Sequence, residues 1–91
     1  PGVEQLANEG FVPSGSRRNH DHASGYCRYS DHITTSQRLM LSDSQTSGGL
    51  LISIPEKEAE GYLNTFNSKS EIKAHIIGKV TSKSSELVKI Y

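Results

Sequence analysis

The sequence predicts an α+β fold, with helices packed on a small mixed sheet. One observation is a helical stripe, because four apolar residues recur at the i, i+3, i+4, i+7 spacing of one helix face: Ala59, Tyr62, Leu63 and Phe66. Another is the near-continuous apolar run 50–54, which is typical of a strand covered on both faces. The third is the alternation of apolar and polar residues over 72–80 and again over 87–91, which indicates half-buried strands.

The N-terminal part of the chain predicts one short helix and a long connection. Residues 1–10 carry apolar residues on one side, and Gly10 stands where a glycine commonly ends a helix. Residues 11–36 contain proline, glycine, several serines and mixed charges without a sustained period, so we expect an irregular loop region there.

The remaining residues, 37–91, predict an α-β-α-β-β core. Good helix formers over 36–41 indicate a short helix, with Thr35 or Ser36 as its N-cap. Pro55 fits the first position of the next helix, which carries the apolar stripe and ends near residues 67–68. The last two strands are expected to form an antiparallel hairpin. Strand 50–54 has few helices to cover it, so exposed apolar surface or self-association is expected.

Composition and charge exclude several classes of function. Lys plus Arg and Asp plus Glu are 10 each, so the formal net charge is +0 and no field favours nucleic acid or an anionic membrane. The single cysteine, Cys27, permits no intramolecular disulfide, which favours a reducing, cytoplasmic setting. Residues 1–91 fit one domain, and the start at Pro1 rather than methionine predicts that this is part of a longer chain.

The segment 43–54 carries the most informative local chemistry. Two adjacent glycines, Gly48 and Gly49, precede the apolar run, and Thr46 and Ser47 add hydroxyl groups. Exposed amides in such a turn can bind an anion, but the same residues also make an ordinary turn before a strand. A Walker loop links a strand to a helix, so this arrangement does not match one.

Two further clusters have both a functional and an ordinary interpretation. Arg17 and Arg18 follow a Pro-Gly turn, where they either contact an anion or form a solvated basic turn. The second cluster contains residue types that bind metals and could form a metal site: His20, Asp21, His22, Cys27, Asp31 and His32. Their spacing matches no known metal motif, so we expect an exposed loop and no metal site.

Taken together, two separated motifs resemble the selenophosphate synthetase (selenide, water dikinase) family. Residues 10–19, Gly-Phe-Val-Pro-Ser-Gly-Ser-Arg-Arg-Asn, resemble the family's Pro-Gly-Gly-Thr turn that precedes an Arg-Asn pair. Residues 43–51, Asp-Ser-Gln-Thr-Ser-Gly-Gly-Leu-Leu, resemble its Asp-Pro-Gln-Thr-Ser-Gly-Gly-Leu-Leu block, and 77–80 resemble its Ile-Gly-Glu-Val. Serine departs from the typical family residue at four positions: Ser14, Ser16, Ser42 and Ser44.

The resemblance implies the second half of a C-terminal domain like that of aminoimidazole ribonucleotide synthetase. The parent enzyme would make selenophosphate from selenide and ATP with Mg²⁺, releasing AMP and phosphate, as a cytoplasmic homodimer. Its nucleophile and metal ligands would lie in a missing N-terminal nucleotide-binding domain, so no catalytic residue is expected here and the isolated piece should be inactive. The residues carried over as candidates to line the phosphate-bearing cleft are Arg18, Asn19, Gln45, Thr46, Ser47, Gly48 and Gly49.

Two other readings remain open at this point. The chain could be the C-terminal domain of another ATP-using member of the superfamily, such as a thiamine-phosphate kinase or a hydrogenase-maturation relative. It could also be a non-enzymatic assembly module, because the residues alone describe only an α+β domain with one notable loop.

Overall fold

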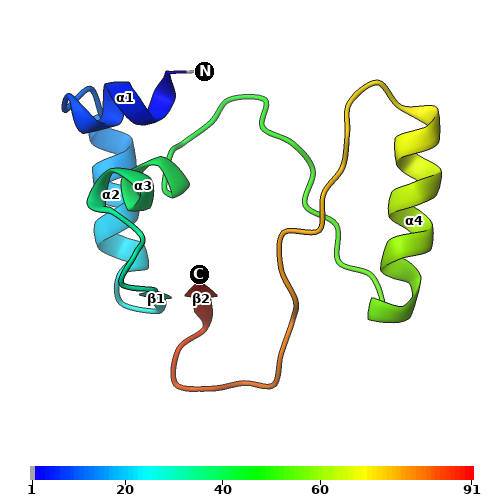
Figure 1. Ribbon diagram of the computed structural model, residues 1–91. Helices are drawn as coiled ribbons and strands as arrows, with labels where there is room; N and C mark the ends of the chain where they lie inside the picture. The colour runs from blue at the N-terminus through cyan, green and yellow to red at the C-terminus, as the bar shows by residue number, and fades with distance from the viewer. Residues whose placement is uncertain (1) are drawn as a thin grey trace. The chain divides into compact units, whose positions relative to one another are not determined.

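The computed structural model describes residues 2–91, and it divides into two compact units. The first unit comprises the residues up to Gly48 together with Lys83–Tyr91, and the second comprises Gly49–Ser82. The first unit contains α1 (Val3–Asn8), α2 (Ser14–Ala23), β1 (Cys27–Tyr29), α3 (Thr35–Leu41) and β2 (Val88–Ile90), and the second contains α4 (Glu56–Lys69) (Figure 1). Helices together with a two-stranded sheet confirm the predicted α+β class.

The core of the first unit forms where α3 packs against α1 and α2 (Figure 1). Ala7 on α1 and Leu39 on α3 are its buried apolar residues, at 8% and 9% exposure. The most deeply buried side chain of the described residues is polar: Ser16 on α2 is 1% exposed. A buried hydroxyl needs a hydrogen-bond partner, so this core depends on polar contacts as well as on apolar packing.

Helix α1 confirms the helix predicted within residues 1–10, including its glycine end. Gly10 has a φ of 91°, in the left-handed region that glycine enters without a Cβ penalty. Its N–H donates to the carbonyl of Ala7 at 3.1 Å, and the N–H of Phe11 donates to the carbonyl of Leu6 at 2.9 Å. This pair of bonds is the Schellman motif, and it satisfies two carbonyls that the end of the helix would otherwise leave unpaired.

Helix α3 is also where the sequence predicts it, although its cap is Thr34 rather than Thr35 or Ser36. The Thr34 hydroxyl accepts from the Gln37 N–H at 3.2 Å, and the Gln37 side chain accepts from the Thr34 N–H at 2.9 Å. This reciprocal capping box satisfies donors that the first turn leaves free. It fixes the start of the helix that carries Leu39.

The irregular loop region predicted for 11–36 is wrong in part, because α2 and β1 lie within it. The α2 sequence, Ser-Gly-Ser-Arg-Arg-Asn-His-Asp-His-Ala, has only its last residue apolar. A helix without an apolar stripe gives no periodic signal. Polar contacts to the rest of the first unit hold it in place instead.

In the second unit, α4 confirms the predicted helix after Pro55, but its stripe is not buried. No residue of α4 is buried, and Tyr62 and Phe66 stack on each other with ring centroids 6.2 Å apart. In its last turn, Asn67 pairs with the backbone of Ala74 beyond the helix: Nδ2 donates to the carbonyl at 3.2 Å, and Oδ1 accepts from the N–H at 2.8 Å. This amide pair anchors the segment that follows the helix.

Two of the three predicted core strands are absent from the described chain. Residues 50–54 and 72–80 form no strand and pair with none, and Leu50 is 92% exposed. The expected burial of 50–54 is therefore wrong, whereas the expected exposure of apolar surface is confirmed. A strand needs a neighbour for its backbone hydrogen bonds, and within Gly49–Ser82 none is available.

The third predicted strand exists as β2, but the expected antiparallel hairpin is wrong. β2 pairs in parallel with β1, with Cys27 opposite Val88, Arg28 opposite Lys89 and Tyr29 opposite Ile90. The sheet is thus formed by segments far apart in the sequence rather than by neighbouring strands. No helix in the described part of the chain is long and apolar enough to cross a membrane.

Candidate functional site

The first turns of α2 contact the segment that leads into the 45–49 loop. The buried Ser16 hydroxyl donates to Asp43 Oδ1. One turn further along α2, Asn19 Nδ2 donates to the carbonyl of Ser42 at 3.0 Å and to the hydroxyl of Ser44 at 2.8 Å. The structure therefore brings together the two motifs that the sequence analysis singled out, and we call this contact the α2–loop junction.

The loop itself begins at the junction and is exposed. Gln45, Thr46, Ser47 and Gly48 are all exposed, and Ser47 has a φ of 60°, in the left-handed region. A non-glycine residue in that region is uncommon and marks a tight turn. Hydroxyls and amides of the turn are therefore accessible to a partner or a ligand, and Gly49 continues from it as the first residue of the second unit.

Of the predicted site residues on α2, the structure brings one to the loop and leaves the other apart from it. Asn19 contacts the loop entry directly, whereas Arg18 is exposed on α2 and, among the residues the structure describes, its side chain makes no hydrogen bond to 45–48. Sequence reasoning missed Ser16 and Asp43 as the anchor of the junction. Each lies within one of the two motifs, 10–19 and 43–51, but a contact over 27 positions leaves no local signal.

Gln45 also borders an apolar cavity of about 380 Å³ in the first unit. Its walls come from α1, α3 and the residues between α1 and α2, including Leu6, Phe11 and Met40. The junction residues Ser16 and Asp43 line the same cavity. The loop entry is therefore supported by hydrogen bonds on α2 and lies beside apolar side chains of α1 and α3.

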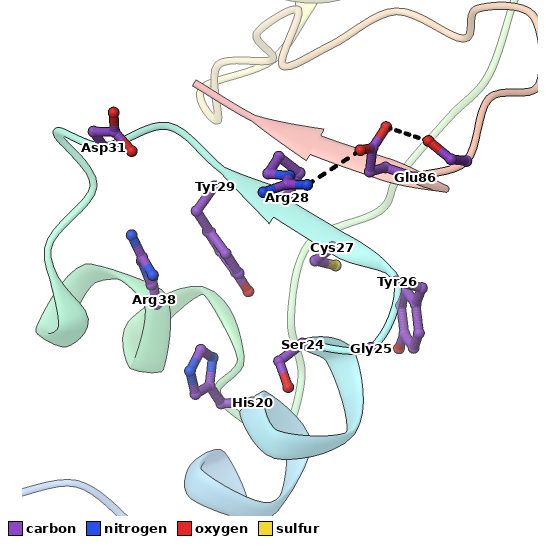
Figure 2. A pocket seen from close by; sticks show the side chains of 11 residues that line it. His20, Ser24, Gly25, Tyr26, Cys27, Arg28, Tyr29, Asp31, Arg38 and Glu86 are labelled. Atoms are coloured by element: carbon purple, nitrogen blue, oxygen red, sulfur yellow. Dashed lines mark hydrogen bonds and ion pairs between the residues drawn. The ribbon is translucent and has the colours of Figure 1, made fainter.

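A second pocket of about 500 Å³ is more polar and lies between the end of α2, β1, α3 and the residues before β2. Figure 2 shows His20, Tyr29 and Arg38 facing the same hollow from three different elements. Arg38 Cζ lies 5.0 Å from the centroid of the Tyr29 ring, and the His20 and Tyr29 ring centroids are 5.9 Å apart.

Some residues weighed as metal ligands do line this pocket, namely His20, Cys27 and Asp31. Even so, within residues 2–91 no group of three or more His, Cys, Asp or Glu side chains is arranged to hold a metal ion. Sequence reasoning did not identify Tyr29 or Arg38, because the pocket forms only when β1 and α3 fold together.

The Glu86 carboxylate lies at the rim of this pocket and is held by several partners. The Ser85 hydroxyl donates to Oε2 at 3.0 Å, and Arg28 Nη2 donates to Oε1 at 3.4 Å (Figure 2). Lys89 Nζ lies 3.7 Å from Oε2. The hydrogen bond from Ser85 is the largest of the causes that hold the pKa of Glu86 below its usual 4.5, and Arg28 and Lys89 act in the same direction.

The Ser85→Ala change is expected to raise the pKa of Glu86 toward 4.5, because it removes the leading contact to the charged form. A pKa lowered by folding stabilises the fold above pH 4.5, and this contribution is lost as the pH falls through the lowered value. NMR titration of the Glu86 side-chain carboxyl carbon in both proteins measures the shift. An unchanged midpoint in Ser85→Ala would show that this hydroxyl does not set the pKa.

Comparison with known proteins gives one consistent family. The chain is 35% identical over 89 residues to the selenide, water dikinase 2 of Peptoclostridium acidaminophilum, covering 94% of this chain and 24% of that protein. It is 33% identical over 89 residues to the selenide, water dikinase of Clostridioides difficile (98% of this chain, 26% of that protein). The enzyme of Caldanaerobacter subterraneus is 38% identical over 82 residues (90% and 24%). No family model matches this chain, and neither does any solved structure.

The chain is thus an α+β segment related to a family of dikinases, and it spans about a quarter of the length of the curated relatives it matches. In sequence it is a relative of the selenide, water dikinases, that is, of the selenophosphate synthetases. The resemblance predicted from residues 10–19 and 43–51 is confirmed.

Proposed function

We propose that the chain is part of a selenide, water dikinase whose complete protein makes selenophosphate from selenide and ATP and releases AMP and phosphate. The observation that carries the proposal is the similarity of nine tenths or more of the chain to enzymes of that name. We place the complete protein in the cytoplasm as a homodimer.

The nucleotide and metal chemistry is assigned to the rest of the complete protein. In the described residues the acidic, histidine and cysteine side chains do not gather as a metal site, so they fit a Mg²⁺ centre poorly. We therefore infer that the ligands of ATP and Mg²⁺ lie in an N-terminal nucleotide-binding domain, and that the 91 residues alone are inactive. That domain is the proposed partner of this chain.

In this proposal the 45–49 loop, with Arg18 and Asn19, lines the cleft toward the nucleotide-binding domain. The α2–loop junction supports this role, because Asn19 fixes both Ser42 and Ser44 immediately before the loop. The contribution is one of position: a loop held in one place orients and shields a substrate without reacting with it.

A chimera of the Clostridioides difficile relative, with this chain in place of its matched segment, tests the proposal. The chimera is expected to form AMP in a selenide-dependent reaction, whereas the 91 residues alone are not. Asn19→Ala in the chimera is expected to lower kcat/KM by roughly 10- to 100-fold, as misplacement of a positioning element does. Arg17→Gln, on the exposed side of α2, serves as the matched control and should leave the rate within about twofold.

Two results would count against the proposal. A folded, soluble chimera without selenide-dependent AMP formation would contradict the assigned chemistry. Equal rates in Asn19→Ala and Arg17→Gln would contradict the positioning role of the junction while leaving the chemistry intact.

A further inference from the structure

The polar pocket of the first unit contains a buried ring nitrogen whose hydrogen bond is not satisfied by the chain. His20 Nδ1 is inaccessible to solvent and has no hydrogen-bond partner among the residues that the structure describes. An unpartnered buried polar atom costs free energy, so such an atom in a folded protein calls for an explanation, for example an unseen water or ion. The pocket wall at His20 is therefore suited to a polar ligand.

Arg38 supplies an uncommitted cation in the same pocket. Its Nε donates to the carbonyl of Ile33 at 3.0 Å, and its guanidinium lies over the Tyr29 ring. These two contacts fix the plane of the guanidinium, yet within residues 2–91 no carboxylate pairs with it. The N–H groups on its two terminal nitrogens remain for a ligand, and Arg presents such groups in a fork that matches an oxyanion.

The remaining charges around the pocket do not neutralise Arg38. Glu86 is already engaged by Arg28 and Lys89. Asp31 is exposed at the opposite end of the hollow from His20 (Figure 2). The arrangement leaves a fixed cation and an imidazole with an unsatisfied nitrogen facing one hollow beside the Tyr29 ring (Figure 2).

We propose that this pocket binds a small oxyanion of the phosphate type between Arg38 and His20, with the Tyr29 ring as its wall. The guanidinium supplies charge-assisted hydrogen bonds, and a turn of the imidazole ring toward the hollow would let Nδ1 supply one more N–H donor. No bond is made or broken in the ligand. The site is separate from the 45–49 loop, and it depends neither on the assigned reaction nor on the rest of the complete protein.

Titration of the 91-residue chain with inorganic phosphate at constant ionic strength, followed by NMR, tests the proposal. Saturable shifts are expected at the His20 ring and at the Arg38 side chain. Arg38→Gln is expected to weaken binding at least about tenfold, as the loss of a charge-assisted hydrogen bond does. His20→Phe keeps an aromatic ring beside Tyr29 but removes the donor, and it should weaken binding by about fivefold or more.

Arg17→Gln is the matched control, because it removes the same charge from an exposed position on α2 outside the pocket. It should change the affinity by less than about twofold. Arg38→Lys keeps the charge but not the planar fork, so weaker binding in this variant shows geometry rather than net charge. It also replaces Arg38→Gln in the comparison if that variant does not fold.

A parallel titration with AMP identifies the source of the oxyanion. Tighter binding of AMP than of phosphate assigns the site to a nucleotide phosphate, and equal or weaker binding assigns it to the free ion. Wild-type shifts that do not saturate would overturn the proposal. So would equal weakening in Arg17→Gln and Arg38→Gln, since that result would indicate a non-specific effect of net charge.

Discussion

Asp43→Ala is expected to destabilise the first unit by about 1–3 kcal/mol, because it leaves the Ser16 hydroxyl without its partner. Ser16 is 1% exposed, so water does not replace the lost acceptor. Each kcal/mol lowers Tm by roughly 4–8 °C in a chain of this size. Thermal unfolding followed by circular dichroism, together with hydrogen exchange of the α3 amides, measures the change.

Substitution of the other partner, Ser16, gives the matched control, because Ser16 is buried and Asp43 is exposed. In Ser16→Ala the exposed Asp43 carboxylate is hydrated, so the loss should be only about 0.5–1.5 kcal/mol. The double variant should match Ser16→Ala within about 0.5 kcal/mol, because no unsatisfied hydroxyl remains. An Asp43→Ala variant as stable as the wild type would contradict the proposed anchor.

Leu39→Ala is expected to cost about 2–5 kcal/mol, which is enough to unfold the contact of α3 with α1 and α2. The first unit has Ala7 and Leu39 as its buried apolar residues, so few other contacts compensate for the loss. The expected result is an α3 whose amides exchange at nearly the rate of an unfolded chain. Hydrogen exchange and urea unfolding of the variant measure it.

Leu41→Ala removes the same atoms from the same helix, but Leu41 is 61% exposed. Its effect should stay within about 0.5 kcal/mol. Equal losses for the two leucines would mean that α3 is stabilised by helix propensity rather than by its packing on α1 and α2.

Local patterns predicted the helices that carry apolar residues and end signals. Gly10 ended α1 because glycine enters the left-handed region without a Cβ penalty, and Pro55 preceded α4 because its fixed φ suits the start of a helix. Helix α2 gave no such signal, since its stability comes from Ser16 and Asn19, whose partners lie more than twenty positions away. Polar contacts of that range cannot be predicted from local sequence.

The strands were predicted less well for a related reason. Apolar residues over 50–54 describe a segment that could be buried, but burial requires a neighbouring surface that the pattern does not supply. For β2 the alternation located the strand and said nothing of its partner, which is β1 rather than 72–80. Pairing is a property of the whole fold.

In the candidate site, too, some residues could be predicted from the sequence and others depend on the fold. Local chemistry marked the 45–49 loop as a turn, Asn19 was predicted only through the family resemblance, and the structure adds that Asn19 contacts the loop entry. Arg38 was predicted only as part of a helix, because its place over Tyr29 depends on the fold of β1.

The parallel pairing of β1 with β2 also sets an order of events during synthesis. Cys27–Tyr29 leaves the ribosome long before Val88–Ile90, and at about 5–20 residues per second the intervening stretch of about 60 residues takes roughly 3–12 s. Throughout that interval β1 lacks β2 beside it, whereas α1 and α2 are already complete and α3 is completed early in it. The helical part of the first unit therefore has time to fold first, and the polar pocket closes only when the last strand arrives.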